Sequence, residues 1–279
     1  MLLGLPVDGK AINSFVMQAN SLCHQALDID LIEGQAGARG QGVNLKRLKD
    51  YYPTFRLDDD SSQEIILQKT MCYLILLFGN VLFPDSTGNT VNFMYLRLLM
   101  DFTRVSLYSW GSVVLAMLYQ SLCKNAKNDS CTFYGCALLV QVWGWWRMPI
   151  MTPINRTSWT FPYAMRFCMK KMDFTKNPWS NITMYRQLID HLRPEDFIWR
   201  SYLECDHEPR GADAAIWTAR TCLILYNIIE MHHSDRFKLQ FGMHQGIPDP
   251  PVDLGVWHLR RVNHQWNHPN WKDFAPEWR

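Results

Sequence analysis

The sequence predicts a mainly α-helical fold, a compact multi-helix domain with little or no β-sheet. The first observation is a pair of long uncharged runs, Val105–Cys123 and Cys131–Trp146. In both, apolar side chains recur at the three- and four-residue spacing of one helix face. The second observation is that the chain lacks a regular alternation of short buried strands with helices, which is the pattern of a parallel sheet.

The two runs are expected to form an antiparallel helical hairpin, about residues 105–147, at the centre of the domain. A polar stretch separates the runs, and Pro149 ends the second helix. The predicted inward faces place Trp110, Leu139 and Trp143 in the core. Truncation of Trp143 to alanine is therefore expected to cost about 3 to 5 kcal/mol.

Each run is about as long as a membrane span, which needs about 20 apolar residues. Serine, glycine and glutamine residues interrupt the runs, and the mean hydropathy of the whole chain is slightly negative. A hairpin in the core of a soluble domain is therefore favoured over insertion into a membrane.

Composition indicates an ordered domain without an evident charged partner. The 279 residues are 48% hydrophobic and 13% aromatic, enough to bury a large core as a single domain spanning residues 1–279, with a candidate subdivision near residue 150. The net charge of +2 is too small to indicate nucleic acid unless the basic residues gather on one face.

The N-terminal half is typical of helices joined by polar turns. A helix is expected over residues 14–27, and a glycine-rich loop follows at 33–43. This loop lacks the leading strand of a phosphate-binding loop. Asn44 is expected to cap a short basic helix.

Three consecutive acids, Asp58 to Asp60, allow two interpretations: a metal site, or the capped start of the next helix, residues 62–78. The cap is favoured because no second carboxylate cluster appears. A further helix is expected to turn four side chains inward: Tyr95, Leu98, Leu99 and Phe102.

The C-terminal half is expected to contain further helices separated by proline-rich and aromatic-rich segments. These are a helix at 163–172, a helix to Leu192 that begins at Asn181 or Thr183, a helical stretch at 213–229, a short helix capped by Ser234 and a final amphipathic helix at 253–266.

Basic residues interleaved with aromatic ones give a candidate nucleic-acid surface, since this composition suits single strands. A solvated basic face over a buried aromatic seam is the favoured interpretation. The candidate contacts are Arg166, Lys170, Lys171, Lys176, Arg260 and Arg261.

The eight cysteines lie mostly in apolar helical runs, and no secretory signal is evident, so free thiols in a reducing compartment are expected. No catalytic residue is predicted. Ser121-Leu122-Cys123-Lys124 matches S-x-x-K, but the companion motifs of that enzyme class are absent. Zinc is not predicted, because the paired short ligand spacings are missing. The residue types that could bind zinc occur at Cys205, His207, Glu208, His232, His233, His264 and His268.

Five blocks, in order, carry a family resemblance. They are Leu2–Gly9; Gly79–Asp85 with Gly88–Val91; Tyr108–Ser112 with Leu115–Tyr119, Gly135–Cys136 and Leu139–Trp145; Tyr185–Asp190 with Ile198–Trp199; and Glu230–Pro248. Together they resemble the plant mobile domain, the transposon-related domain of the maintenance-of-meristems family, also catalogued as aminotransferase-like and attached to long-form phosphatases. This sequence departs from the family at Trp146, Ser201 and Leu239, where an acid, a proline and an arginine are usual.

The resemblance implies a nuclear interaction module that supports transcriptional regulation, transposon silencing and meristem maintenance with a phosphatase-like protein partner. Direct binding of DNA or RNA, and a degenerate or unrecognised hydrolase or transferase, are the alternatives. The implied signature residues are Trp110, Gly111, Trp143, Trp145, Arg147, Arg186, Glu230, Arg236, Gln240 and Gly242.

The aminotransferase label finds little support in the residues. A pyridoxal-phosphate enzyme needs a Schiff-base lysine, a phosphate cup and an acidic partner for the ring nitrogen, usually on an α/β scaffold. No such pattern occurs, and metallophosphatase motifs are also missing, so no cofactor is expected.

Family members generally carry a strand hairpin and a helix ahead of the first block, so the sequence resembles an N-terminally shortened copy. An exposed apolar patch beside Leu2, Leu3 and Leu5 is therefore expected, and with it self-association or partner binding.

Overall fold

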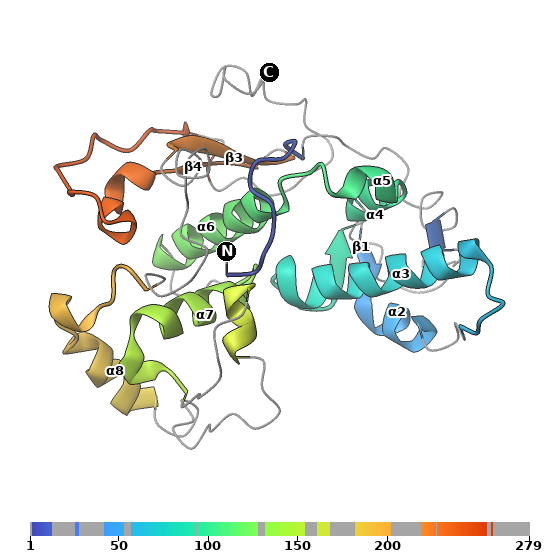
Figure 1. Cartoon of the computed structure of the whole chain (residues 1–279), viewed down its shortest axis with the longest axis horizontal. Coiled ribbons are helices and arrows are strands. Elements are labelled where there is room, and N and C mark those ends of the chain that lie inside the picture. The colour runs from blue at the N-terminus through green and yellow to red at the C-terminus, as the bar shows by residue number, and fades with distance from the viewer. Residues whose placement is uncertain are drawn as a thin grey trace. The chain divides into compact units, whose positions relative to one another are not determined.

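The computed structural model describes residues 2–12, 26–27, 42–52, 57–92, 94–127, 132–153, 161–167, 182–201, 219–226, 228–255 and 258 (Figure 1). The chain divides into two compact units. Unit 1 comprises residues 1–5, 137–221 and 231–253, and unit 2 comprises residues 6–136, 222–230 and 254–279. The predicted mainly α-helical class is confirmed, with two small two-stranded sheets among the described residues.

Unit 2 holds most of the regular structure. Its elements are β1 (Gly42–Asn44), α2 (Leu45–Tyr51), α3 (Gln63–Leu77), the π-helical turn η2 (Phe78–Leu82), β2 (Thr90–Asn92), α4 (Met94–Leu99), α5 (Phe102–Val105) and α6 (Trp110–Lys127). The hairpin β3 (Thr221–Leu225) and β4 (Ile228–His232) contributes its inner residues to this unit. Strand β1 pairs antiparallel with β2.

Unit 1 combines α-helices with short 3-10 helices. They are α7 (Ala137–Arg147), η3 (Pro149–Met151), η4 (Tyr163–Phe167), α8 (Ile182–Asp190), η6 (Pro194–Asp196), η7 (Ser234–Arg236) and η8 (Lys238–Phe241). Its hydrophobic core includes Val142 and Trp146 of α7 with Tyr163 and Phe167 of η4.

Local capping explains where two helices begin. The side chain of Asn44 accepts a hydrogen bond from the Arg47 amide at 3.1 Å, as predicted for α2. Ser62 caps α3 in the same way through the Ile65 amide, and Asp58 hydrogen-bonds Ser61 just before it. The predicted helix start near residue 62 is confirmed, but Asp58 to Asp60 lie ahead of the cap and not in the first turn of α3.

An aromatic cluster forms the centre of unit 2. The rings of Phe83 and Tyr95 stack with centroids 4.7 Å apart, and Phe78 lies 5.0 Å from Trp110. Tyr226, which follows β3, meets Tyr95 edge-on at 6.2 Å. The cluster joins α4, η2, α6 and the β3–β4 hairpin, so segments more than 100 residues apart share one core.

The segment Pro6–Ile12 pairs with the start of α6. The amide of Gly111 donates to the Pro6 carbonyl at 2.7 Å, and the Ser109 hydroxyl donates to the Val7 carbonyl at 2.8 Å. Lys10 forms a parallel bridge with Tyr108, and Ile12 forms one with Leu225. Two of the sequence blocks quoted above are therefore bonded to each other.

The helical stretch predicted at 213–229 is wrong where the structure describes it, because β3 and β4 occupy that region. Residues Cys222–Leu225 and Ile228–Glu230 are all buried. A strand buried on both faces has a continuous apolar run, which periodicity cannot separate from a buried helix. Tyr226 has φ +54°, the left-handed conformation that a tight hairpin connection requires.

The predicted inward face of α7 is also wrong in part. Val142, Trp146 and Arg147 are buried, whereas the exposed fraction of Trp143 is 39% and Leu139 is half-buried. Almost every side chain on this helix is apolar, so the sequence offers no polar face to orient it. Helices α6 and α7 belong to different units, and their antiparallel pairing stays a prediction.

Three smaller expectations also need correction. Gly42 belongs to β1 rather than to the glycine-rich loop, Ser234 is the first residue of η7 rather than its cap, and Asp253 and Leu254 are not helical. Most of the expected helices at 14–27 and 253–266 lies outside the described residues, although Ala26 and Leu27 are helical and buried.

The expected apolar patch at Leu2, Leu3 and Leu5 is not what the structure shows. All three side chains are half-buried, Leu2 packs against the core of unit 1, and its carbonyl accepts the Ala164 amide at 2.9 Å. Self-association remains a prediction without this patch to support it.

Among the described helices, α3 with η2 (Gln63–Leu82) is long and apolar enough to cross a membrane by length and composition alone. This is a weak indication, because a core helix passes the same test. Met71, Cys72, Ile75 and Phe78 of this helix are buried in unit 2.

Candidate functional site

Three aromatic side chains in unit 1 form a surface that we call the aromatic ledge: Trp143 of α7, with Phe197 and Trp199 from the segment after η6. The ring centroids of Trp143 and Phe197 are 5.9 Å apart, and those of Phe197 and Trp199 are 4.7 Å apart. Trp143 and Trp199 are 39% and 40% exposed. Two tryptophans in mutual contact with Phe197 thus remain open to solvent.

The buried side chain of Arg147 contacts the ledge at Trp143. Arg147 is only 4% exposed, and its guanidinium lies 5.0 Å from the centroid of the Trp143 ring. One of its amino groups donates to the Gln240 side-chain carbonyl at 3.1 Å, and its main-chain carbonyl accepts the Ile198 amide at 2.9 Å. Arg147 therefore connects α7, the 197–199 segment and η8, and fixes the orientation of Trp143.

Gly242 lies next to the Arg200 side chain, which follows Trp199 in the chain. Its φ is +71°, and an added Cβ would lie 2.8 Å from the guanidinium carbon of Arg200. The left-handed turn ends η8 at Gly242. The backbone conformation is what requires glycine here, because the flexible Arg200 side chain can move away from an added Cβ.

The rings of the ledge pack directly on one another. Among the described residues, no group of three metal-ligating side chains occurs. Partly exposed tryptophans beside an arginine are the residue types that dominate binding energy in protein interfaces.

Unit 2 contains a second polar feature at the signature residue Glu230. This buried carboxylate bonds the His258 ring nitrogen Nδ1 through Oε2 at 2.8 Å, while its Oε1 atom is buried without a hydrogen-bond partner. Burial raises the pKa of the Glu230 carboxyl above its ordinary value of 4.5, while His258 and Lys124 act in the opposite direction.

The raised pKa of Glu230 predicts a pH-dependent stability. Because the folded pKa exceeds the unfolded one, the contribution of Glu230 is fully present below pH 4.5 and is lost as pH rises through the folded pKa. We expect Glu230→Gln to remove this part of the pH dependence. Urea unfolding from about pH 4 to about pH 7 measures it. Glu64→Gln, at an exposed acid of α3, is the control, and parallel wild-type and Glu230→Gln profiles would contradict the assignment.

The remaining signature residues have separate positions. Trp110 and Gly111 are buried in unit 2, whereas Trp145 is half-buried in unit 1 and lies 5.0 Å from the Phe167 ring. Arg186 is exposed on α8, and Arg236 hydrogen-bonds the Asp249 carbonyl. Of the ten, Trp143, Arg147 and Gln240 are linked to one another at the ledge.

The nucleic-acid candidates are only partly described. The Arg166 guanidinium lies 4.9 Å from the Trp146 ring centroid and 5.9 Å from that of Phe167, so it packs against the core of unit 1. The other five, Lys170, Lys171, Lys176, Arg260 and Arg261, lie outside the described residues.

Of the candidate zinc ligands, only two lie among the described residues. His232 and His233 are described, and burial lowers the pKa of both imidazoles. Cys205, His207, Glu208, His264 and His268 lie outside the described residues. The described cysteines Cys72, Cys123, Cys136 and Cys222 are free thiols, as predicted, and burial raises the pKa of Cys72 to about 12.

Sequence reasoning missed Phe197 and Arg200 as members of the site. The sequence placed Ile198–Trp199 in a family block without a site role, although two aromatic residues in a polar region are a usable signal. Their meeting with α7 depends on a main-chain bond between Ile198 and Arg147, 51 positions apart.

Comparison with known proteins gives one family. The protein-family model described as plant mobile domain matches residues 1–278 of this chain. Protein MAIN-LIKE 2 of Arabidopsis thaliana is 30% identical over 92% of this chain and 38% of its own length. Protein MAINTENANCE OF MERISTEMS of the same plant is 28% identical over 89% of this chain and 51% of its own length.

A further Arabidopsis relative is named serine/threonine-protein phosphatase 7 long form homolog. It is 29% identical over 90% of this chain and only 20% of its own length. The chain thus spans about half or less of the length of these relatives. No solved structure matches the chain.

Proposed function

Because this chain belongs to the plant mobile domain family, we propose that it is a non-enzymatic interaction module that binds a protein partner through the aromatic ledge. The cellular setting that we infer is the nucleus, where the module supports transcriptional regulation, transposon silencing and meristem maintenance. Relatives named for meristem maintenance support this inference. The proposed partner is phosphatase-like.

One observation carries the proposal, the exposure of Trp143 and Trp199 around a buried arginine. Side chains that only fill a core are covered by their neighbours. Trp143 and Trp199 instead keep part of their apolar surface in contact with water, where a partner can bury it. Arg147 and Phe197 hold the rings in place, so little side-chain entropy is lost when a partner covers them.

The direct test is binding of the purified chain to the Arabidopsis phosphatase 7 long form homolog, measured by calorimetry. We expect Trp143→Ala and Trp199→Ala each to weaken binding about thirtyfold, the effect of removing an interface hot spot of about 2 kcal/mol. Tyr73→Ala removes an exposed aromatic ring from α3 in the other unit and serves as the matched control.

Two results would contradict the proposal. Equal affinity of the wild type and both ledge variants would show that the ledge is not the docking surface. Binding of single-stranded DNA that weakens steeply with salt and depends on Trp143 and Trp199 would instead favour the nucleic-acid alternative.

A further inference from the structure

The segment Leu239–Val252 in unit 1 presents several apolar side chains to solvent. Ile247 has a relative exposure of 101%, and Leu239, Met243 and Val252 are also exposed. A single exposed apolar residue is ordinary, whereas this segment carries four within fourteen positions. These residues are not part of the aromatic ledge.

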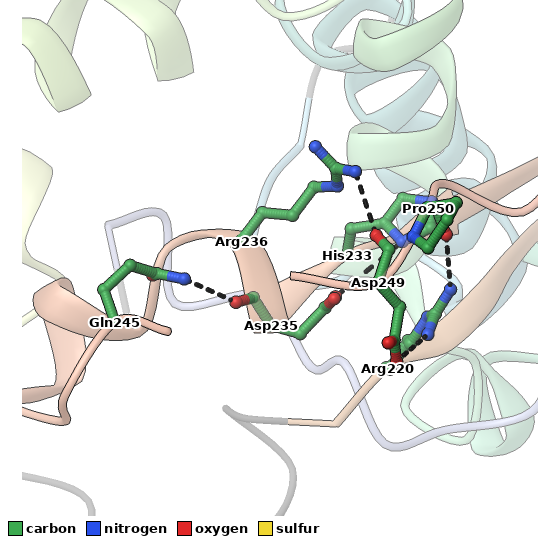
Figure 2. A network of polar contacts seen from close by, with 7 residues as sticks. All are labelled: Arg220, His233, Asp235, Arg236, Gln245, Asp249 and Pro250. Atoms are coloured by element: carbon green, nitrogen blue, oxygen red, sulfur yellow. Dashed lines mark hydrogen bonds and ion pairs between the residues drawn. The ribbon is translucent and has the colours of Figure 1, made fainter. Parts of the chain in front are cut away.

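The chain on both sides of Ile247 is held by hydrogen bonds (Figure 2). Before it, the Gln245 side chain accepts the Lys238 amide at 2.8 Å and donates to the Asp235 carbonyl at 2.9 Å. These bonds join the loop to the main chain of η7 and η8 two residues ahead of its most exposed side chain.

Two arginines hold the chain after Ile247. Arg236 donates to the Asp249 carbonyl at 3.0 Å, and Arg220 donates to the Pro250 carbonyl at 3.4 Å, as Figure 2 shows. Arg220 also lies 3.6 Å from the Asp249 carboxylate. Ile247 therefore lies exposed between two parts of the chain that are held by hydrogen bonds.

Proline further restricts this part of the loop. Pro248, Pro250 and Pro251 have φ fixed near −65° by their rings, and each residue before a proline is confined to extended or polyproline conformations. Every position from Ile247 to Pro251 is thus a proline or precedes one. The loop therefore loses less conformational entropy on binding than a flexible peptide would.

We propose that residues 247–251 are a preformed recognition segment for a protein domain with an aromatic-lined groove of the kind that binds extended, proline-containing chains. Aromatic-lined grooves of SH3 and WW domains bind such segments because the extended conformation is already populated. The Asp249 carboxylate is largely exposed but lies 3.6 Å from Arg220, so the proposal rests on the shape of the segment and not on its charge. This interaction surface is separate from the aromatic ledge and does not depend on it.

The test uses the full chain and a panel of purified SH3 and WW domains, with affinity measured by fluorescence anisotropy. We expect at least one domain of the panel to bind, and Ile247→Asp and Pro248→Ala each to weaken that binding about tenfold or more. Because Ile247 is fully exposed, Ile247→Asp should leave the unfolding midpoint unchanged.

Three further variants test the role of the anchor and provide controls. Gln245→Ala keeps Ile247 but removes the anchor ahead of it, and should weaken binding less than Ile247→Asp. Ile182→Asp changes an exposed isoleucine on α8 and should have no effect. Trp199→Ala on the ledge should also have no effect, which separates this test from that of the proposed function.

Failure of every domain in the panel to bind, or equal binding by wild type, Ile247→Asp and Pro248→Ala, would overturn the proposal. Sedimentation that shows a dimer lost in Ile247→Asp would identify a second copy as the occupant and would overturn it too. The same holds if anionic lipid vesicles bind the chain through Ile247 while the domains do not.

Discussion

Gly9→Ala is expected to destabilise unit 2 by about 3 kcal/mol, because the new methyl group would meet main-chain atoms that cannot rotate away. A Cβ at this position would lie 2.5 Å from the Tyr108 carbonyl carbon and 2.6 Å from the Leu107 oxygen. To relieve these contacts, Pro6–Ile12 must separate from the segment before α6. The bonds of Lys10 with Leu107 and Ser109 would then weaken together.

Chemical denaturation measures this effect, and Gly246→Ala provides the control. An added Cβ at Gly246 meets nothing within 4 Å, and its φ is not in the left-handed region, so the control should change stability by less than about 0.5 kcal/mol. A Gly9→Ala protein as stable as the wild type would mean that the Pro6–Ile12 pairing does not hold unit 2 together.

Trp110→Ala should cost about 3 to 5 kcal/mol, the range for truncation of a buried tryptophan. The side chain is 5% exposed, its ring lies 5.0 Å from Phe78 and 6.0 Å from Tyr108, and its indole nitrogen donates to the Val105 carbonyl at 2.8 Å. Removal would leave a cavity in the aromatic cluster and an unmade hydrogen bond to Val105.

Trp143→Ala is the matched comparison and should cost only about 1 kcal/mol, mainly the lost contact with Arg147 and Phe197. This replaces the larger cost that the sequence pattern predicted for Trp143. Unfolding free energies for both variants decide the point. A loss at Trp143 as large as that at Trp110 would mean that the ledge is a packed core.

Local features of the sequence were sufficient to predict much of unit 2. Asn44 and Ser62 cap helices because their side chains satisfy amides three residues ahead, a bond that depends only on local geometry. The uncharged run that contains α6 predicted a buried helix, and Trp110, Val113, Val114, Ala116 and Leu118 of α6 are buried. Family membership follows from ordered blocks along the chain, which need no coordinates.

Patterns made only of apolar residues were ambiguous. Cys222–Leu225 and Ile228–Ile229 carry no polar residue that would distinguish a strand covered on both faces from a helix. In α7, tryptophans at 143, 145 and 146 point in different directions, and the sequence alone could not show that Trp146 would be buried and Trp143 exposed. Packing partners settled both cases.

The sequence by itself determined that this chain is a mainly helical plant mobile domain, because helix propensity, capping and family motifs reside in neighbouring residues. Only the tertiary structure decided where the candidate surfaces lie. The ledge combines Trp143 with Phe197 and Trp199, Arg147 beneath it bonds Gln240, and the Ile247 loop is held by Arg220 and Arg236. Contacts between residues this far apart depend on how the chain folds back on itself, which no local pattern encodes.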